Sequence, residues 1–336
     1  MVTVDYHDDL KNVQGDPALA ALLSAPAAPA PFDRLAWWQG LADHCGLRPL
    51  LAVAREGDAL AVLALRREAG RLEALANWYT FRFRPILTAN AGAGLLDALA
   101  RDLARRTPRL VLSGLPDEDP ASVRLAEALS RTGWTVWTEP CDTNHVLALD
   151  GRSFADYLAA RPGPLRTTLK RKRGKVQALV IDRFDGEAWA AFEAIYAASW
   201  KPAEGSPAFL RAFAEAEGSA GRLRFGMAFA DGEPVAAQFW TVEGATAFIH
   251  KLAHRQDSTS LSPGTVLSAA LFEQVIDRDR VAMVDFGTGD DAYKRDWMEQ
   301  VRTRHRLTAL RPGAPANWPL LARRAIARLA GRGAHG

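Results

Sequence analysis

Three runs of hydrophobic, strand-favouring residues follow one another from Phe225 to His254. The polar pairs Asp231-Gly232 and Glu243-Gly244 interrupt them, and such pairs favour the tight turns of antiparallel hairpins. After Ser262 the apolar positions instead recur at helical spacing. The pattern therefore predicts an antiparallel meander, then a helix, then a buried strand from Arg280 to Phe286.

The expected helix begins at Ser262-Pro263-Gly264-Thr265. Ser262 suits the N-cap, and Pro263 suits the first helical position because its missing N–H is not needed there. The amides of Gly264 and Thr265 are then free, and the positive end of the helix dipole favours an anion beside them. A helix start that is merely well capped is the alternative interpretation.

The segment before residue 150 repeats this order of elements. Strand signals from Leu50 to Ala76 are separated by Glu56-Gly57 and Ala69-Gly70, and a helix start at Gly92 and a strand from Arg109 follow. The matching order and spacing indicate a duplicated α/β unit. We place the halves at 1–150 and 151–312, with a basic tail at 313–336. The first half is expected to build the acceptor side, and the second half to bind the donor.

Three motifs of the second half resemble those of a known superfamily: the strand Ile249–His254, the Ser-Pro-Gly-Thr helix start, and the run Asp285-Phe-Gly-Thr-Gly-Asp-Asp-Ala-Tyr-Lys with Trp297. Together they resemble the GNAT acyl-CoA transferases, and more narrowly the CelD/BcsL-type acetyltransferases related to FemABX proteins. The resemblance implies a tandem GNAT-like α/β (α+β) fold of two mixed, mostly antiparallel sheets flanked by helices. It also implies an acyl-CoA co-substrate, acetyl-CoA above all. The chain lacks the usual R/Q-x-x-G-x-G/A pyrophosphate loop.

Composition describes an ordinary globular chain of 336 residues, of which 48% are hydrophobic and 24% charged. The net charge of +3 does not by itself argue for nucleic acid. The two cysteines are too few for a disulfide framework or a zinc site. With no signal peptide or spanning segment evident, the cytoplasm is the expected location.

Two stretches are strongly basic. Residues 161–175 hold seven cations, including Arg171 and Lys172, and no acid, which suits a polyanion such as an acceptor phosphate or the phosphates of CoA. A solvated helix is the alternative, and nucleic acid is disfavoured because no aromatic residues interleave the charges. The second stretch, Trp318–Arg332, has the pattern of a basic amphipathic helix, which suits either packing on its own domain or peripheral contact with the inner membrane surface.

Acyl transfer needs a base for the acceptor, an acid for the thiolate and a donor to the thioester carbonyl. A backbone amide of a splayed strand, here Phe248–Leu252, is the carbonyl donor that the resemblance implies. His250, Asp291, Tyr293 and Lys294 are the catalytic candidates, with His250 first as the base. No metal is required. Each residue also has a structural alternative: a core histidine, a helix cap, or packing and ion pairing. The donor is assigned to Ser262, Gly264, Thr265 and Lys251, and the acceptor to Asp290, Gln238, Arg171 and Lys172.

These observations favour an acyl-CoA-dependent N-acyltransferase that modifies an amino sugar or a related precursor of exopolysaccharide, cellulose or the cell envelope. Two alternatives stay open. One is an aminoacyl-tRNA-dependent transferase of the FemABX type, and the other is a non-catalytic GNAT-fold binding protein of polysaccharide biosynthesis.

Overall fold

The computed structural model describes residues 1–332, with side chains up to residue 326. The strands are β1 (Thr3–His7), β2 (Pro49–Glu56), β3 (Ala59–Glu68), β4 (Arg71–Ala74), β5 (Ile86–Leu87), β6 (Arg109–Pro116), β7 (Thr135–Ala148), β8 (Gln177–Ile181), β9 (Leu223–Ala230), β10 (Glu233–Glu243), β11 (Thr246–His254), β12 (Met283–Thr288) and β13 (Gln300–Leu310). The α-helices are α1 (Leu10–Gln14), α2 (Pro17–Leu22), α3 (Leu35–Cys45), α4 (Ala93–Arg106), α5 (Pro120–Arg131), α6 (Phe154–Ala159), α7 (Gly163–Lys172), α8 (Gly186–Ala197), α9 (Pro207–Ser219), α10 (Pro263–Glu273), α11 (Ala292–Trp297) and α12 (Trp318–Arg332). Short helical turns are η1 (Pro31–Asp33), η2 (Gln256–Leu261), η3 (Gln274–Arg278) and η4 (Pro315–Asn317).

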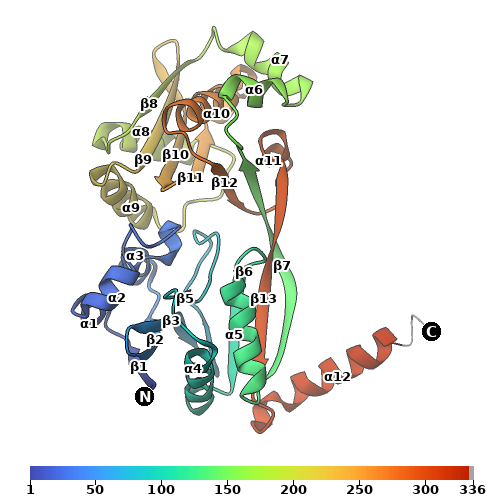
Figure 1. The fold of residues 1–336 in the computed structure, drawn as a ribbon. Helices are drawn as coiled ribbons and strands as arrows, with labels where there is room; N and C mark the ends of the chain where they lie inside the picture. The colour runs from blue at the N-terminus through green and yellow to red at the C-terminus, as the bar shows by residue number, and fades with distance from the viewer. Residues whose placement is uncertain (333–336) are drawn as a thin grey trace.

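Within the described residues the strands form a thirteen-stranded sheet in the order β1-β2-β3-β4-β6-β13-β7-β12-β11-β10-β9-β8, with β5 paired to β3. The elements up to α5 occupy the lower part of Figure 1 and those from α6 to α11 the upper part, whereas β13 and α12 return to the lower part. Most neighbours are antiparallel, but β4 and β6 pair in parallel, and so do β11 and β12. The expected mixed, mostly antiparallel architecture is confirmed.

The duplication is visible in the strand pairing. In each half a three-stranded antiparallel meander is followed by a helix and then by a strand that pairs in parallel with the third meander strand: β2-β3-β4, α4 and β6, then β9-β10-β11, α10 and β12. The turn at Asp231-Gly232 has positive φ at both residues, 51° and 84°, as a tight hairpin requires. The meander predicted from Phe225 onward is confirmed.

The expectation of two separate sheets is wrong, because β7 and β13 join the halves. β13 lies between β6 and β7, and it pairs with β7 from Gln300↔Val146 to Leu310↔Thr135. The other end of β7 pairs with β12. β7 has 14 residues and is long enough to serve both halves. Residues 300–310, assigned to the second half by sequence position, therefore complete the sheet of the first.

Neighbouring residues of β10 face two different cores. Phe239 belongs to the cluster with Trp189 of α8, whereas Trp240 belongs to the cluster with Phe272 of α10. Successive strand side chains point to opposite faces, so α8 and α10 cover opposite faces of the C-terminal part of the sheet. Each helix thereby borders a different side of β11.

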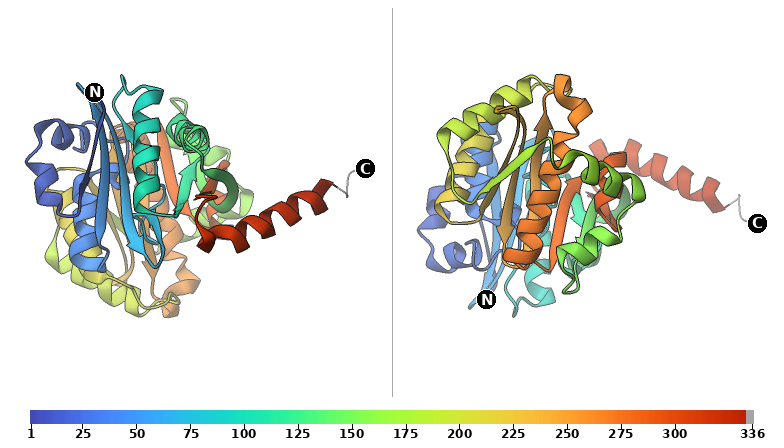
Figure 2. Two further views of the ribbon diagram at one scale, coloured as in Figure 1. Left: turned by 90° about the horizontal axis from the view of Figure 1, so that it is seen from below. Right: turned by 90° about the horizontal axis from the view of Figure 1, so that it is seen from above.

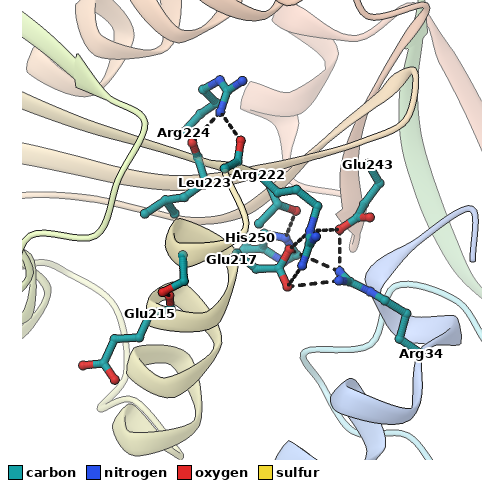
Figure 3. Close-up of polar contacts among 11 residues, drawn as sticks. Arg34, Glu215, Glu217, Arg222, Leu223, Arg224, Glu243 and His250 are labelled. Carbon is teal, nitrogen blue, oxygen red and sulfur yellow. Dashed lines mark hydrogen bonds and ion pairs between the residues drawn. The ribbon is translucent and has the colours of Figure 1, made fainter. Parts of the chain in front are cut away.

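A buried ion cluster ties the first half to the second. Arg34, at the start of α3, lies 3.1 Å from Glu217 of α9 and also pairs with Glu243 at the end of β10. Arg222 reaches Glu217 at 2.6 Å from the other side. Figure 3 shows Arg34 approaching both carboxylates from the N-terminal half. Arg34, Glu217 and Glu243 are each at most 4% exposed, so water screens none of these charges.

Stability should depend on pH through Glu243. Burial and the neighbouring Glu217 carboxylate raise the pKa of Glu243 to about 7. The folded chain then holds a proton that the unfolded chain has released above about pH 4.5, so this group's contribution to stability falls as pH rises from about 5 to about 7. We expect Glu243→Gln to remove up to roughly 3 kcal/mol of pH dependence across this range, measured by urea unfolding.

The contribution of Glu243 must be taken from the difference in the free energy of unfolding between Glu243→Gln and the wild type at each pH. Burial lowers the pKa of His250 to about 3, so its contribution to stability rises with pH between about 3 and 6.5 and opposes that of Glu243. His250 contributes equally to both proteins and cancels in the difference. A difference that stays constant from pH 5 to 7 would contradict the assignment to Glu243.

Helix α12 extends away from the body in all three views (Figures 1 and 2). Trp318 and Ile326 are 58% and 65% exposed, and Arg324 lies over the ring of Trp137 at 5.2 Å. The predicted helix is confirmed, although the side chains of Arg328, Leu329 and Arg332 lie outside the described residues. None of the helices described is long and apolar enough to cross a membrane.

Candidate functional site

The parallel strands β11 and β12 separate after three residues. They pair from Thr246↔Met283 to Phe248↔Asp285, and beyond that point β11 keeps only β10 as a partner. A register shift opposite Phe239 and Trp240 leaves His250 as an extra residue in β11. Backbone groups of Ile249–Leu252 therefore border an opening in the sheet, as expected for the splayed strand.

A glycine at the end of β12 helps to hold this opening. Gly287 has φ of 71°, and its amide donates to the Asp285 carboxylate at 2.8 Å. A Cβ at Gly287 would lie 2.8 Å from the ring of Phe81, which belongs to the first half. Glycine is required for both the backbone conformation and the close contact. The first half thus forms one wall of the opening.

Two cavities meet at the opening. The splay cavity, of about 190 Å³, lies between the halves, and its walls include Trp37, Trp78, Tyr79, Phe81, Lys201, Lys251, Thr288, Asp291, Tyr293 and Lys294. The helix-start cavity, of about 300 Å³, is lined by residues that include Leu165, His254, Ser262, Gly264, Thr265 and Trp297. Leu252 and Tyr293 line both. A ligand in one cavity can therefore approach a ligand in the other at these two residues.

The start of α10 is partly as predicted. Pro263 occupies the first turn, and Ser262, Gly264 and Thr265 line the helix-start cavity. Ser262 does not act as a side-chain N-cap, because its backbone is left-handed (φ 51°) and its hydroxyl makes no capping bond. The amide of Thr265 is not free, since it donates to the Ser262 carbonyl at 3.1 Å. The amide of Gly264 has no partner among the described residues.

Basic residues of α7 lie beside this helix start. Lys172 donates to the carbonyl of Ser260, in the turn before α10, at 2.6 Å, and Arg171 is exposed. Arg161, by contrast, is buried and pairs with Glu299. The exposed cations of α7 and the residues after it make no ion pair with an acid that the structure describes: Lys170, Arg171, Arg173 and Lys175. These charges are free to bind an anion near the helix-start cavity.

Of the two adjacent aspartates, only Asp291 lines the splay cavity. It occupies the N-cap position of α11, as the structural alternative predicted, but its side chain makes no capping bond. Asp290 is instead held by Arg295 at 2.5 Å and by His145 at 3.2 Å, and the Arg295 hydrogen bond lowers the pKa of its carboxyl. Asp290 therefore does not reach the splay cavity, and its predicted acceptor role has no support in the geometry.

Tyr293 and Lys294 differ in their surroundings. Tyr293 lies between the two cavities, packs edge-on against Phe286 at 5.5 Å, and has a pKa raised by burial, so its hydroxyl stays protonated. The Lys294 ammonium donates to the carbonyls of Thr288 and Gly289. Lys294 thereby holds the loop that carries Asp291, whereas Tyr293 has a proton to offer at the junction.

Two other sequence candidates are engaged by the protein itself. His250 lines the splay cavity, is half-buried among aromatic rings, including Phe81, Phe213 and Phe239, and hydrogen-bonds Thr241 at 2.8 Å. With its pKa lowered by burial to about 3, it is a poor proton acceptor, so we do not retain it as the base. The Gln238 amide donates to Gly264 and Ser268 and fastens α10 to β10, rather than facing a ligand.

Lys251, Tyr79 and Lys201 also line the splay cavity, and Glu204 binds two of them. Lys251 pairs with Glu204 at 2.7 Å, and its ammonium lies 4.8 Å from the ring centroid of Tyr79. Tyr79 also donates to Glu204. Burial lowers the pKa of Lys201 to about 8. Tyr79, Lys201 and Glu204 lie in loops without a recognisable pattern, so no local signal could have found them. No group of three or more His, Cys, Asp or Glu side chains in the described part of the chain is arranged to hold a metal ion.

The acetyltransferase (GNAT) domain family matches residues 163–295. The chain therefore contains a GNAT acetyltransferase domain over less than half of its length, and this match supports an acyltransferase. The GNAT domain includes α10, the splayed β11 and Asp291, so the family match covers most of the residues that the second half contributes to the two cavities. No curated protein matches the sequence significantly.

Solved structures extend the likeness to both halves of the chain. FemX has a TM-score of 0.62 at 9% identity and covers 90% of this chain and 96% of its own. A tandem GNAT protein from the clavulanic acid biosynthesis pathway has a TM-score of 0.52 at 17% identity, with 94% and 100% covered. The C-terminal domain of a putative lysylphosphatidylglycerol synthetase from Agrobacterium fabrum scores 0.57 at 12% identity, with 93% and 94% covered. The tandem GNAT fold is thereby confirmed.

Proposed function

We propose that this protein transfers an acyl group from acyl-CoA, with acetyl-CoA as the preferred donor, to the amino group of a sugar or related precursor of a surface polysaccharide. The observation that carries this proposal is the junction of two cavities at Leu252 and Tyr293, beside the splayed β11. A donor in the helix-start cavity and an acceptor in the splay cavity would meet there. Holding both reactants in place removes much of the entropic barrier to a bimolecular reaction.

The helix-start cavity suits the donor. The Gly264 amide and the positive end of α10 favour a diphosphate, and the unpaired cations of α7 are near enough to contribute further anion binding. Ser262 and Thr265 would contribute hydroxyl groups rather than the capping and amide contacts expected from the sequence. Lys251 faces the splay cavity and pairs with Glu204, so we no longer assign it to the donor.

The splay cavity suits the acceptor and the chemistry. Its aromatic walls can pack against a sugar ring, and the Asp291 carboxylate can bind an amino group and take its proton, directly or through water. The amine nitrogen bonds to the thioester carbon, the carbon–sulfur bond breaks, and Tyr293 protonates the departing thiolate. Amides along Ile249–Leu252 can donate to the carbonyl oxygen as negative charge develops on it.

A thermal-shift experiment tests the donor. CoA or acetyl-CoA at about 100 times its dissociation constant should stabilise the wild type by about 2.7 kcal/mol, which raises Tm by several degrees. Gly264→Val should abolish the shift, because its side chain enters the helix-start cavity. Gly94→Val, at the same position of helix α4 in the other half, is the matched control and should retain it. No shift with CoA or any acyl-CoA would refute the proposed donor.

An aminoacyl-tRNA donor is the second candidate, favoured by the unpaired cations of α7 and by the FemX-like fold. The two donors can be separated by the same measurement. Charged tRNA, and not acetyl-CoA, should raise Tm if this candidate is correct. A non-catalytic binding protein would instead bind a ligand without releasing thiol from any acyl-CoA.

We also propose that α12 contacts an anionic membrane surface. The segment from Trp318 to the C-terminus contains no acidic residue, and Arg323 and Ile326 are exposed on a helix that extends from the body. Because one arginine near such a surface contributes about 1 kcal/mol, Arg323→Gln should weaken co-sedimentation with phosphatidylglycerol vesicles roughly fivefold. Arg101→Gln, on the exposed face of α4, should leave it unchanged. Equal binding to neutral phosphatidylcholine vesicles would contradict the proposal.

A further inference from the structure

Lys201 lies between the splay cavity and a third, apolar cavity. The apolar cavity, of about 610 Å³, is lined by residues of α8, α9 and the loop between them, including Trp189, Phe192, Tyr196 and Pro207. Lys201 and Leu210 line both cavities. Lys201 belongs to the loop that joins α8 to α9, and its ammonium lies 5.7 Å from the ring centroid of Trp200. The Lys201 ammonium group therefore lies at the wall of the splay cavity, which we assign to the acceptor.

The charge of Lys201 has no counterpart in the described structure. Its ammonium makes no ion pair and no hydrogen bond with any described residue, although its surroundings are largely buried. The other two lysines of the splay cavity are satisfied: Lys251 by Glu204, and Lys294 by two backbone carbonyls. Asp291 lines the same cavity but lies beyond ion-pair distance. A partly desolvated cation without a partner is unfavourable, and a bound anion would remove that cost.

We propose that the acceptor is an amine that also bears an anionic group, a carboxylate or a phosphate, and that Lys201 binds this group. The amino group then lies toward Asp291 and the anionic group toward Lys201, so the two charged ends fix the orientation of the acceptor. A charge-assisted hydrogen bond of this kind typically favours binding by roughly 10- to 100-fold. The apolar cavity beyond Lys201 leaves room for an acceptor larger than a monosaccharide. This inference rests on the proposed function.

Matched acceptors test the inference by binding alone. Glucosamine is compared with glucosamine 6-phosphate and with glucosaminuronic acid, using isothermal titration of the full chain in the presence of CoA. Glucosamine lacks an anionic group, whereas the other two probes carry a phosphate or a carboxylate. Comparing these two anionic probes therefore shows which anionic group is preferred. We expect at least one anionic probe to bind 10-fold or more tightly than glucosamine.

Three variants separate anion binding from other roles. Lys201→Gln should abolish the preference for an anionic probe over glucosamine, whereas Lys201→Arg should keep this preference because the cation remains. Lys11→Gln, which replaces an exposed lysine of α1, should leave the preference unchanged. In acyl-transfer assays, Lys201→Gln should raise KM for the anionic acceptor more than it lowers kcat. A preference that survives in Lys201→Gln, or equal binding of neutral and anionic probes, overturns the inference.

A catalytic base at position 201 would give a different result. Lys201→Arg would then lose acyl transfer to every acceptor while Lys201→Gln kept the binding preference, and this outcome also overturns the inference. Failure of the proposed function would be recognised separately. It would appear as the absence of a thermal shift with CoA, which tests the donor and not the charge of the acceptor.

Discussion

Replacing Arg34 with methionine is expected to lower the free energy of unfolding by about 3–5 kcal/mol, because the two buried carboxylates lose their buried cation and keep only the more exposed Arg222. Glu217 and Glu243 are held apart from water at the contact between the two halves (Figure 3). Methionine fills much of the volume of the arginine stem, so lost packing contributes little. Urea unfolding at pH 8 measures the effect, since the pKa of Glu243, about 7, leaves it mostly ionised there.

A matched arginine provides the control. Arg55 also pairs with an aspartate, Asp16, but both side chains are 32% exposed. Exposed ion pairs contribute about 0–1 kcal/mol, so Arg55→Met should destabilise the protein far less than Arg34→Met. Adding Glu217→Gln and Glu243→Gln to Arg34→Met should recover part of the loss. Equal effects at Arg34 and Arg55 would show that the cluster is not isolated from water.

Replacing Asp291 with asparagine is expected to lower kcat/KM for acyl transfer by about 10²–10⁴-fold, the usual contribution of a positioned general base. Asparagine keeps the size of the side chain but cannot accept the proton of the acceptor amine. Asp291 makes no capping bond, so the fold should lose little stability. Initial rates of thiol release, measured with and without acceptor, give the effect on transfer.

The neighbouring carboxylate is the control for this variant. Asp290 is engaged by Arg295 and His145 outside the splay cavity, so Asp290→Asn should change kcat/KM by no more than a few-fold. The thermal shift with CoA should be unchanged in both variants, because neither residue lines the helix-start cavity. If Asp290→Asn were the more damaging of the two, the assignment of the base to Asp291 would have to be abandoned.

Local features of the sequence were sufficient to predict the elements that flank the site. Turn pairs such as Asp231-Gly232 need positive φ at both positions, and a proline in the first turn marks the start of α10; both requirements involve only neighbouring residues. The duplication was visible for the same reason, because each half repeats the same local signals. The resemblance to GNAT motifs pointed to Gly264, Asp291 and Tyr293, each of which lines at least one of the two cavities.

Other features depend on contacts between distant residues. Alternation along a strand predicts that His250 and Lys251 face opposite ways, but both line the splay cavity, because the register shift makes His250 an extra residue in β11. Likewise, Asp290 and Asp291 are adjacent in sequence, and the position of His145, 145 residues away, decides which of them is taken out of the cavity.

The sequence by itself determined the strands, turns and helix starts, because these follow from backbone preferences and periodicity over a few residues. Only the tertiary structure decided that β13 returns to lie between β6 and β7, and that Lys201 faces a cavity without a counterion. Strand order and charge pairing depend on which surfaces meet after the chain has folded. No local pattern shows that a side chain will contact a residue nearly 200 positions away in the sequence.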